Sequence, residues 1–351
     1  MSLTSATPPQ TRRNKIVVTG ATGFVGSHAL MALWQGLRGQ PVQVVAACRD
    51  KSRLPIGYAG EVAEGDLLDP AYRRTLVEHA DVVIHAAAWT SLYGHKKQSN
   101  TLFREPSIAL LDEAVKAGVN RFVMVSSTAA APPSSAAAAN APGNAPAFWP
   151  HLGNVVAVED AMRKYADAGR AMITLRLGLF TGERYSLGLL PVLVPRMKSH
   201  LVPWVSGGKT PMPLIAGEDI GAAVLQATTT KGLEGYQGFN ILGADIPTVR
   251  EVISFLASEY NLPKPWFSVP FPMAHVFAAT MEAVSKVTPW DPFITRSIIY
   301  LMRDFHVSNE KAQQVLGYAP TVPWQDAVRR QMAEMKVRQS SPMAMAKPLP
   351  Y

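Results

Sequence analysis

Hydrophobic and polar positions along the first half of the chain alternate between two patterns. Short runs rich in β-branched residues are followed by longer segments in which apolar residues recur with helical spacing. Strands are expected at KIVVTG, VQVVAAC, DVVIHAAA, RFVMVSS and MITLRLG, and helices at 24–37, 71–79, 108–117 and 156–168. Because these strands are apolar on both faces, the pattern predicts an α/β fold with a doubly wound parallel sheet between helices.

The pattern changes after Gly182, where the spacing loosens and prolines cluster between Pro191 and Pro213. The chain beyond this point predicts a smaller C-terminal substrate lobe, with elements that return to the sheet. The expected organisation is an N-terminal tail (1–14), a dinucleotide-binding domain (15–182), the lobe (183–335) and a C-terminal tail (336–351).

An insert of alanine, proline and small polar residues occupies 129–150, between a strand end and a helix start. Such residues bury little apolar surface, so we expect a flexible lid loop. Ligands of open α/β sheets bind at the carboxyl ends of the strands, which is where this insert begins.

Composition narrows the class of protein. The chain has 351 residues, 48% of them hydrophobic and 17% charged, against about 25% charged in ordinary domains. Cys48 is the only cysteine, so no disulfide forms within the chain. We find no secretory signal and no apolar run of ~18 residues that would span a membrane; 272–287 is expected to be an amphipathic helix. A cytoplasmic protein without a membrane span is predicted.

The net charge of +8 resides mainly at the ends of the chain. Residues 1–15 carry +3 and residues 321–351 another +3, which leaves +2 for the rest. No nucleic-acid-binding motif accompanies the charge, so we expect no nucleic-acid partner. The eight histidines show no metal-ligand spacing with cysteine or carboxylates, and no metal is predicted.

A glycine-rich turn, TGATGFVG, directly follows the first strand and opens the first helix. Gly20 allows the tight turn, Gly23 lets the backbone approach a pyrophosphate, and Gly26 lets the helix pack closely on the strand. The helix start offers N–H groups and a positive dipole end to an anion. The predicted cofactor contacts of this turn are Gly20, Thr22, Gly23, Phe24, Val25 and Gly26; the alternative is a purely structural strand-to-helix turn.

The end of the second strand bears on the choice of cofactor. An acidic residue there binds the ribose hydroxyls of NAD, whereas an arginine accommodates the 2′-phosphate of NADP. Arg49 comes first and Asp50 follows, so we expect NADP, with NAD as the alternative if Arg49 is only a surface side chain. Asp66 follows the third strand and is expected to accept a hydrogen bond from the adenine amino group, or else to cap the next helix.

These residues resemble the extended short-chain dehydrogenase/reductase superfamily, specifically its NAD-dependent epimerase/dehydratase group. The motifs that carry the resemblance are TGATGFVG, GDLLD, DVVIHAAA, AGVNRFVMVSS, LRLGLFTGE, GEDIGAAVLQA and VSNEKAQQVLGYAP, over residues ~15–335. PFITR and the apolar helix before it favour the 3β-hydroxysteroid dehydrogenase-like branch. The resemblance implies a Rossmann-type sheet, a homodimer formed through two helices flanking that sheet, and further cofactor contacts at Leu67, Ala86, Ala87, Ala88 and Ser126.

The resemblance also implies a catalytic Ser or Thr after the fourth long strand and a Tyr-x-x-x-Lys pair on the next helix. Ser127 and Thr128 stand at the hydroxyl position. Aligned through Glu159, the helix has His151 in place of the tyrosine and Val155 in place of the lysine. His151 is either a substitute general acid/base or a polar residue at a helix start without a catalytic duty.

A second Tyr-x-x-x-Lys occurs at 93–97, in a loop after a strand. Its glycine and lysines favour a solvated turn, although Tyr93 alone remains a candidate for the substrate pocket. Several aromatic residues fall on loops or strand ends near the predicted cleft: Trp89, Phe148, Trp149, Phe180 and Trp204. They favour a hydrophobic or ring-bearing substrate over a nucleotide sugar, and ordinary packing between lobe and sheet is the alternative.

The sequence thus predicts an NAD(P)-binding enzyme that acts on a hydrophobic alcohol or ketone. Because the lysine is missing, the step is expected to be redox-neutral: a dehydration, an isomerisation or a cyclisation. Ser127 or Thr128 would orient the substrate oxygen, and His151 or Tyr93 would handle the proton. The alternative is a catalytically silent relative that binds dinucleotide as a sensor or subunit.

Overall fold

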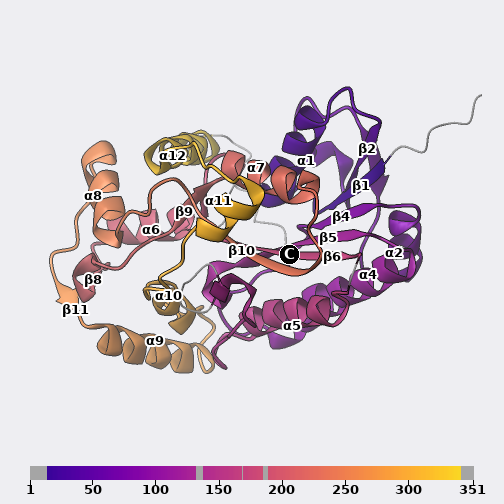
Figure 1. Ribbon diagram of the computed structural model, residues 1–351. Coiled ribbons are helices and arrows are strands. Elements are labelled where there is room, and N and C mark those ends of the chain that lie inside the picture. Colours follow the sequence, from indigo (N-terminus) through magenta and orange to yellow (C-terminus); the bar gives the residue numbers. More distant parts are fainter. Residues whose placement is uncertain (1–13, 132–136, 168, 185–188, 341–351) are drawn as a thin grey trace, which may run out of the picture.

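The fold is a parallel sheet with a helical lobe beside it (Figure 1). The computed structural model describes residues 14–131, 137–167, 169–184 and 189–340. All neighbouring strands of the sheet pair in parallel. In spatial order they are β10 (Gly235–Ile241), β6 (Ala171–Leu177), β5 (Arg121–Ser127), β4 (Val82–His85), β1 (Asn14–Thr19), β2 (Val42–Cys48) and β3 (Glu61–Glu64). The strand order reverses at β1, between β2 and β4, which is where doubly wound sheets bind ligands.

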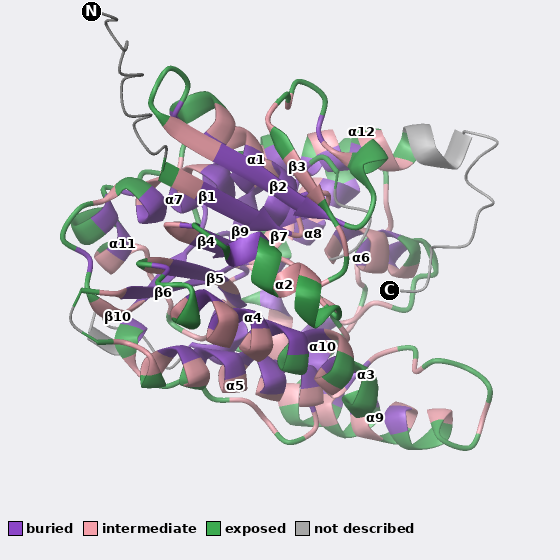
Figure 2. Ribbon diagram, turned by 90° about the vertical axis from the view of Figure 1, so that its right-hand side faces the viewer, coloured by how far each residue is buried: buried purple, intermediate pink, exposed green. Residues whose placement is uncertain are grey.

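Helices cover both faces of the sheet. One face carries α1 (Phe24–Gly36), α7 (Gly217–Thr229) and α11 (Glu310–Leu316), and the other carries α2 (Pro70–Val77), α4 (Glu105–Lys116) and α5 (Pro150–Lys164). Alternate residues of a strand supply the two cores: Val18 packs on the α1 side and Val17 on the α4 side. Every residue of β6 is buried, and Figure 2 shows the buried strands between the two helix layers.

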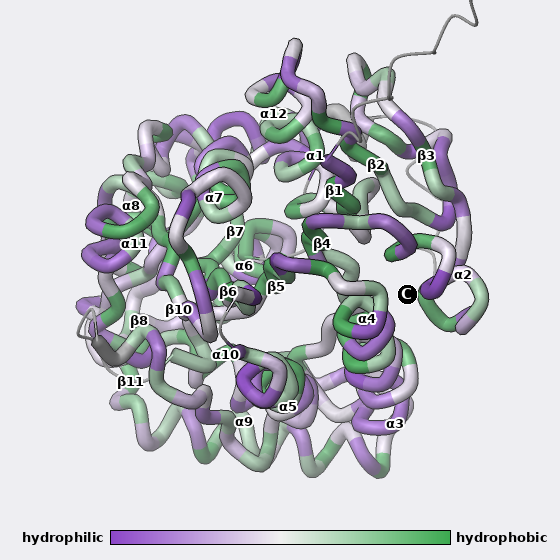
Figure 3. Tube along the Cα trace, turned by 45° about the vertical axis from the view of Figure 1, so that its right-hand side comes forward, coloured by the Kyte–Doolittle hydropathy of each residue, from purple (hydrophilic) through white to green (hydrophobic). Residues whose placement is uncertain are grey.

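The central strands are mostly apolar along their middle, because a strand covered on both faces has no solvated side. Figure 3 shows the hydrophobic stretches of β1 and β2. The predicted doubly wound parallel sheet is therefore confirmed. Its edge strand β10 and the helix α7 both come from the chain beyond residue 183.

The lobe has its own apolar core, formed by α6 (Leu189–Lys198), α8 (Val249–Tyr260) and α12 (Trp324–Ser340). Its remaining elements are α9 (Phe271–Ser285), α10 (Arg296–Leu301), and two parallel strand pairs: β7 (Leu179–Thr181) with β9 (Leu214–Ala216), and β8 (Trp204–Val205) with β11 (Ser268–Val269). No helix among the described residues is long and apolar enough to cross a membrane.

Several helix boundaries differ from the sequence expectation, and three of the differences affect the site or the lobe. α5 begins at Pro150 rather than 156, since proline suits the first turn of a helix. α3 (Lys96–Ser99) and a π-helical turn (Asn100–Arg104) precede α4 without a break. α12 runs to Ser340, past the expected end of the lobe. The expected N-terminal tail before residue 14 and the chain after 340 lie outside the described residues.

The insert at 129–150 packs more closely than its composition suggested. Ala129, Ala130, Ala139 and Trp149 are all buried. Its backbone carbonyls hold it in place: Arg176 donates to the carbonyl oxygens of Ala139 and Ala141. A carbonyl accepts a hydrogen bond whatever its side chain is, which explains how a run of small residues becomes anchored. Residues 132–136 of the expected lid lie outside the described part.

Candidate active site at the carboxyl edge of the sheet

The turn after β1 has the geometry of a dinucleotide-binding loop. Gly20 has a φ of +66°, and a Cβ there would lie 2.6 Å from the backbone of Ala87. A Cβ on Gly26 would lie 2.0 Å from the carbonyl oxygen of Gly20. Both positions therefore require glycine to let the turn, α1 and the end of β4 meet.

Gly23 requires a different explanation. It is exposed, its φ of −78° suits any residue, and a Cβ would meet only the Gly20 carbonyl oxygen, at 3.3 Å. Internal packing therefore explains little of this glycine. α1 has no side-chain cap and no acidic residue in its first turn. The positive end of its dipole is therefore available to bind an anionic ligand. The turn fits the pyrophosphate of a dinucleotide.

A buried polar network fixes the turn against β4. The Thr19 hydroxyl lies 2.9 Å from Nδ1 of His85, and Nε2 of His85 lies 2.9 Å from the Ser107 hydroxyl. The backbone N–H of Ala87 donates to Thr19 Oγ1 at 3.3 Å. Burial lowers the pKa of His85 to about 4. Sequence analysis did not single out these side chains, because only the fold shows that β1, β4 and α4 meet there.

The end of β2 presents basic side chains. The Asp50 carboxylate caps a local turn. It accepts a hydrogen bond from the N–H of Ser52 at 3.0 Å and another from the Ser52 hydroxyl at 2.6 Å. The Ser52 hydroxyl, followed by its N–H, lowers the pKa of Asp50. Arg49 is exposed, and Lys51 follows, held 3.6 Å from Glu64. Neither Lys51 nor Ser52 was among the predicted site residues.

The adenine side of the expected site lies on the loop after β3. Asp66 is exposed and accepts from the N–H of Leu68 at 2.9 Å. The cap of α2 is Asp69, which accepts from the N–H of Ala71. Asp66 is therefore not the cap of that helix. Leu67 is half-buried, as are Ala86 and Ala87, while Ala88 is exposed.

Ser126 belongs to a buried ionic cluster at the end of β5. Its hydroxyl donates to Glu159 Oε1 at 2.6 Å, and Glu159 forms a fully buried ion pair with Arg176 at 2.6 Å. Ser127 caps the next turn by accepting from the N–H of Ala129, and Thr128 is buried. Ser126 thus contacts α5 and β6, whereas Ser127 and Thr128 begin the insert.

His151 lies buried in the first turn of α5. Its Nδ1 is 3.0 Å from the Ser99 hydroxyl oxygen, which also accepts from the Asn154 amide at 2.8 Å. Its ring packs edge-on against Phe103 and Trp89. Burial lowers the pKa of His151 to about 4, so the ring is neutral at pH 7. Val155, one turn later, is buried in the apolar core.

The proton arrangement at His151 follows from its partners. Ser99 is fully buried, and its oxygen already accepts from Asn154. Among the described residues, Nδ1 of His151 is the acceptor within reach of its own proton. A buried hydroxyl donates where it can, which assigns Nδ1 as acceptor and leaves the ring proton on Nε2.

Tyr93 is directed to the lobe rather than to His151. Its hydroxyl donates to the Glu282 carbonyl oxygen at 2.9 Å and lies 2.9 Å from the Ser285 hydroxyl, both on α9. The neighbouring Ser91 carbonyl accepts from the indole N–H of Trp149. The loop that carries Tyr93 therefore joins α9 and the start of α5.

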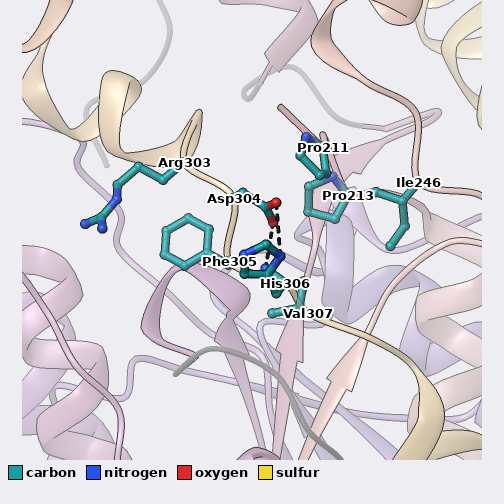
Figure 4. Close-up of a pocket in the computed structure, with 8 residues that line it drawn as sticks. All are labelled: Pro211, Pro213, Ile246, Arg303, Asp304, Phe305, His306 and Val307. Atoms are coloured by element: carbon teal, nitrogen blue, oxygen red, sulfur yellow. Dashed lines mark hydrogen bonds and ion pairs between the residues drawn. The ribbon is translucent and has the colours of Figure 1, made fainter. Parts of the chain in front are cut away.

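A chain of aromatic rings leads from the start of α5 to a pocket in the lobe. Trp149 and Phe148 pack edge-on against Tyr300, and Tyr300 packs in the same way against Phe305. Phe305 lines a pocket of about 220 Å³ (Figure 4). The pocket is formed by Pro211, Pro213, Ile246, Arg303, Asp304, Phe305, His306 and Val307. His306 lies 3.0 Å from the Asp304 carboxylate. Trp204 and Phe180 pack elsewhere, against Arg250 and Phe24 respectively.

Comparisons with known proteins agree with this geometry. Residues 16–241 match the model of the NAD-dependent epimerase/dehydratase family. The chain is 23% identical to the uncharacterized protein YbjS of Escherichia coli (strain K12) over 337 residues, or 92% of this chain and 98% of YbjS.

Two solved structures share the fold. The crystal structure of gox2253 has a TM-score of 0.68 at 22% identity, covering 93% of this chain and 98% of that one. MoeE5 in complex with UDP-glucose and NAD has a TM-score of 0.65 at 20% identity, covering 93% and 100%. The family match spans most of the sheet domain and extends to its edge strand β10. The chain belongs to the NAD-dependent epimerase/dehydratase family.

Proposed function

We propose that the chain is an NADP(H)-dependent enzyme that acts on a hydrophobic alcohol or ketone through a step without net oxidation or reduction. The observation that carries this proposal is the state of His151: buried, neutral and fixed by Ser99, with Val155 where the family's lysine would stand. The expected steps are a dehydration, an isomerisation or a cyclisation.

The glycine turn would hold the pyrophosphate of the cofactor, with the start of α1 directed at its charge. Arg49 would contact the 2′-phosphate, and Lys51 would add a second positive charge nearby. Asp66 and the backbone of Leu67 would hold the adenine. When bound, the nicotinamide ring supplies a site that accepts or returns a hydride.

The substrate would lie between the start of α5 and the lobe. Phe148, Tyr300 and Phe305 are half-buried and provide aromatic surface along this path, with the buried Trp149 behind them, which suits an apolar or ring-bearing molecule. Ser127 or Thr128 would orient the substrate oxygen. The contact of Tyr93 with α9 favours a structural role for its hydroxyl over proton transfer.

His151 would act as a hydrogen-bond donor. A neutral imidazole that carries its proton on Nε2 polarises a substrate oxygen without first becoming charged. Protonating it costs free energy in this apolar setting, and no lysine lies at position 155 to offset a negative charge. These two facts favour a redox-neutral step over the hydride chemistry of the superfamily.

A binding and turnover experiment tests the proposal. Full-length protein is titrated with NADPH and NADH by nicotinamide fluorescence, and then offered a panel of hydrophobic ketones and alcohols, with products identified by mass spectrometry. We expect tighter binding of NADPH, and products isomeric with the substrate or differing from it by water. Arg49→Glu should weaken NADPH binding about tenfold or more, while the control Arg38→Glu, at the far end of α1, should not.

A second candidate substrate class is a nucleotide sugar. MoeE5 was solved with UDP-glucose. Arg303 stands at the wall of the lobe pocket, with its guanidinium over the Tyr300 ring, and would be the cation that binds a diphosphate. Turnover of UDP-glucose without turnover of any compound in the apolar panel would show that the substrate is a nucleotide sugar rather than a hydrophobic alcohol or ketone. Binding of a cofactor without any turnover would instead favour the catalytically silent relative. Binding of neither cofactor would refute both the proposed enzyme and the silent dinucleotide-binding relative.

A further inference from the structure

Helix α9 exposes an apolar face that nothing in the described part of the chain covers. The helix buries only Ala274, Ala278 and Glu282, which recur every four residues along one narrow line. The side chains on the opposite side are Met273, Val276, Phe277, Val284 and, just past the helix, Val287. At about 100° per residue these positions fall on the side of the helix away from Ala274, Ala278 and Glu282, in one stripe. Figures 1 and 2 show α9 at the edge of the molecule, with no element on its outer side.

The exposure of this stripe is large. Val276 is 65% exposed, Phe277 52% and Val287 85%. Eight of the fourteen large apolar side chains that are exposed in the described chain fall between 266 and 293. Soluble monomers rarely gather exposed apolar side chains in this way unless the surface binds something.

Tryptophans and lysines occur close to the stripe in the sequence. Trp266 and Trp290, which are 78% and 73% exposed, flank α9 in the sequence. Lys264 and Lys286 are exposed beside them, and the other exposed charge within 263–293 is Asp291. Glu282 is buried, where it pairs with Arg296.

From these observations we propose that α9 lies on a lipid bilayer that contains anionic headgroups. An exposed apolar stripe of Val, Met and Phe, with exposed tryptophans and lysines nearby in the sequence, is typical of a helix that lies in the membrane interface. The two exposed lysines, Lys264 and Lys286, outnumber the one exposed acid of 263–293, Asp291, and this local positive charge complements anionic lipid. The face binds the bilayer surface without spanning it, and the inference does not depend on the proposed reaction.

Vesicle flotation of the full chain tests this proposal. Vesicles are made of phosphatidylcholine alone or with about one third phosphatidylglycerol. We expect the protein to float with the mixed vesicles, and the double variant Val276→Ser, Phe277→Ser to bind about tenfold more weakly or worse. The matched control is Val315→Ser, an exposed valine on α11, which should bind as the unmodified chain does. Lys286→Glu should weaken binding to the anionic vesicles alone.

A second measurement avoids the question of whether the double variant folds. Brominated lipids quench tryptophan at the depth of the interface, so the unmodified chain should be quenched more strongly than Trp290→Phe. Absence of flotation and of quenching overturns the proposal. Two other occupants would then be identified directly: dissociation of a dimer by the double variant would indicate a second copy of the chain, and vesicle binding that appears only after deletion of 341–351 would indicate that segment.

Discussion

The Nδ1 atom of His151 lies 3.0 Å from the hydroxyl oxygen of Ser99, and this contact determines which ring nitrogen carries the proton. Because Asn154 donates to the same oxygen, the serine proton is directed at the ring. A residue on α3 thereby determines the chemistry offered by a residue on α5.

Removing the Ser99 hydroxyl should therefore change the tautomer of His151. We expect Ser99→Ala to mix the two neutral forms, visible as a shift of the imidazole ¹⁵N resonances, and to lower kcat about tenfold. Ser107→Ala is the matched control, since Ser107 contacts His85 instead. Unchanged His151 resonances in Ser99→Ala would contradict the assignment.

Replacing His151 itself separates a catalytic duty from a structural one. His151→Phe keeps an aromatic ring but removes the Nε2–H donor, so kcat should fall by about two orders of magnitude while cofactor affinity stays the same. Activity equal to that of the unmodified protein would show that His151 is only a buried polar residue at a helix start.

Acid should destabilise the protein through its buried histidines. The pKa of both His85 and His151 is lowered by burial from 6.5 to about 4. Between pH 6.5 and about 4 these histidines are protonated in the unfolded chain but not in the folded chain. The free energy of unfolding therefore falls over this range and levels off below it. The loss is about 3 kcal/mol for each histidine. Urea unfolding of His85→Gln across this range should show a smaller loss, unlike the exposed control His200→Gln.

Gly26 and Gly23, two glycines of the turn, should respond differently to replacement by alanine. Gly26→Ala places a Cβ 2.0 Å from the Gly20 carbonyl oxygen and should cost about 1–3 kcal/mol of stability. Gly23→Ala meets only a 3.3 Å contact, so we expect near-normal stability with cofactor affinity reduced about tenfold. Thermal unfolding and nicotinamide fluorescence measure the two effects. Full cofactor affinity in Gly23→Ala would place the pyrophosphate elsewhere.

Breaking the ion pair between Glu159 and Arg176 should be costly because both side chains are fully buried. Glu159→Gln should lower the free energy of unfolding by about 3–5 kcal/mol by leaving the guanidinium unpaired. Ser126→Ala, which removes one hydrogen bond to the carboxylate, should cost about 1 kcal/mol. The double change Glu159→Leu, Arg176→Met should recover part of the loss in urea unfolding, and equal losses in all three variants would refute the pairing.

Periodicity and turn chemistry predicted much of the fold. The expected strands VQVVAAC and RFVMVSS coincide with β2 and β5, and the glycine turn lies between β1 and α1, because each of these signals is local in the sequence. The amphipathic helix expected at 272–287 is α9, displaced by one or two residues at its ends.

Contacts between distant segments could not be predicted in this way. Nothing near Ser99 indicates that it faces His151, since the two meet only when α3 packs against α5. The anchoring of the insert depends on carbonyl oxygens, which are invisible in a pattern of side chains. The use of Asp50 as a local cap likewise depends on the turn that Ser52 completes.

The hydrogen bond from Tyr93 to the Glu282 carbonyl joins the loop after β4 to the helix that we assign to the bilayer. Any displacement of α9 at a membrane must either carry this loop with it or break the bond. Thermodynamic linkage makes such coupling reciprocal: the factor by which vesicles change cofactor affinity equals the factor by which the cofactor changes vesicle affinity. Tyr93→Phe removes this bond, so vesicles should then change cofactor affinity less than they do in the unmodified chain.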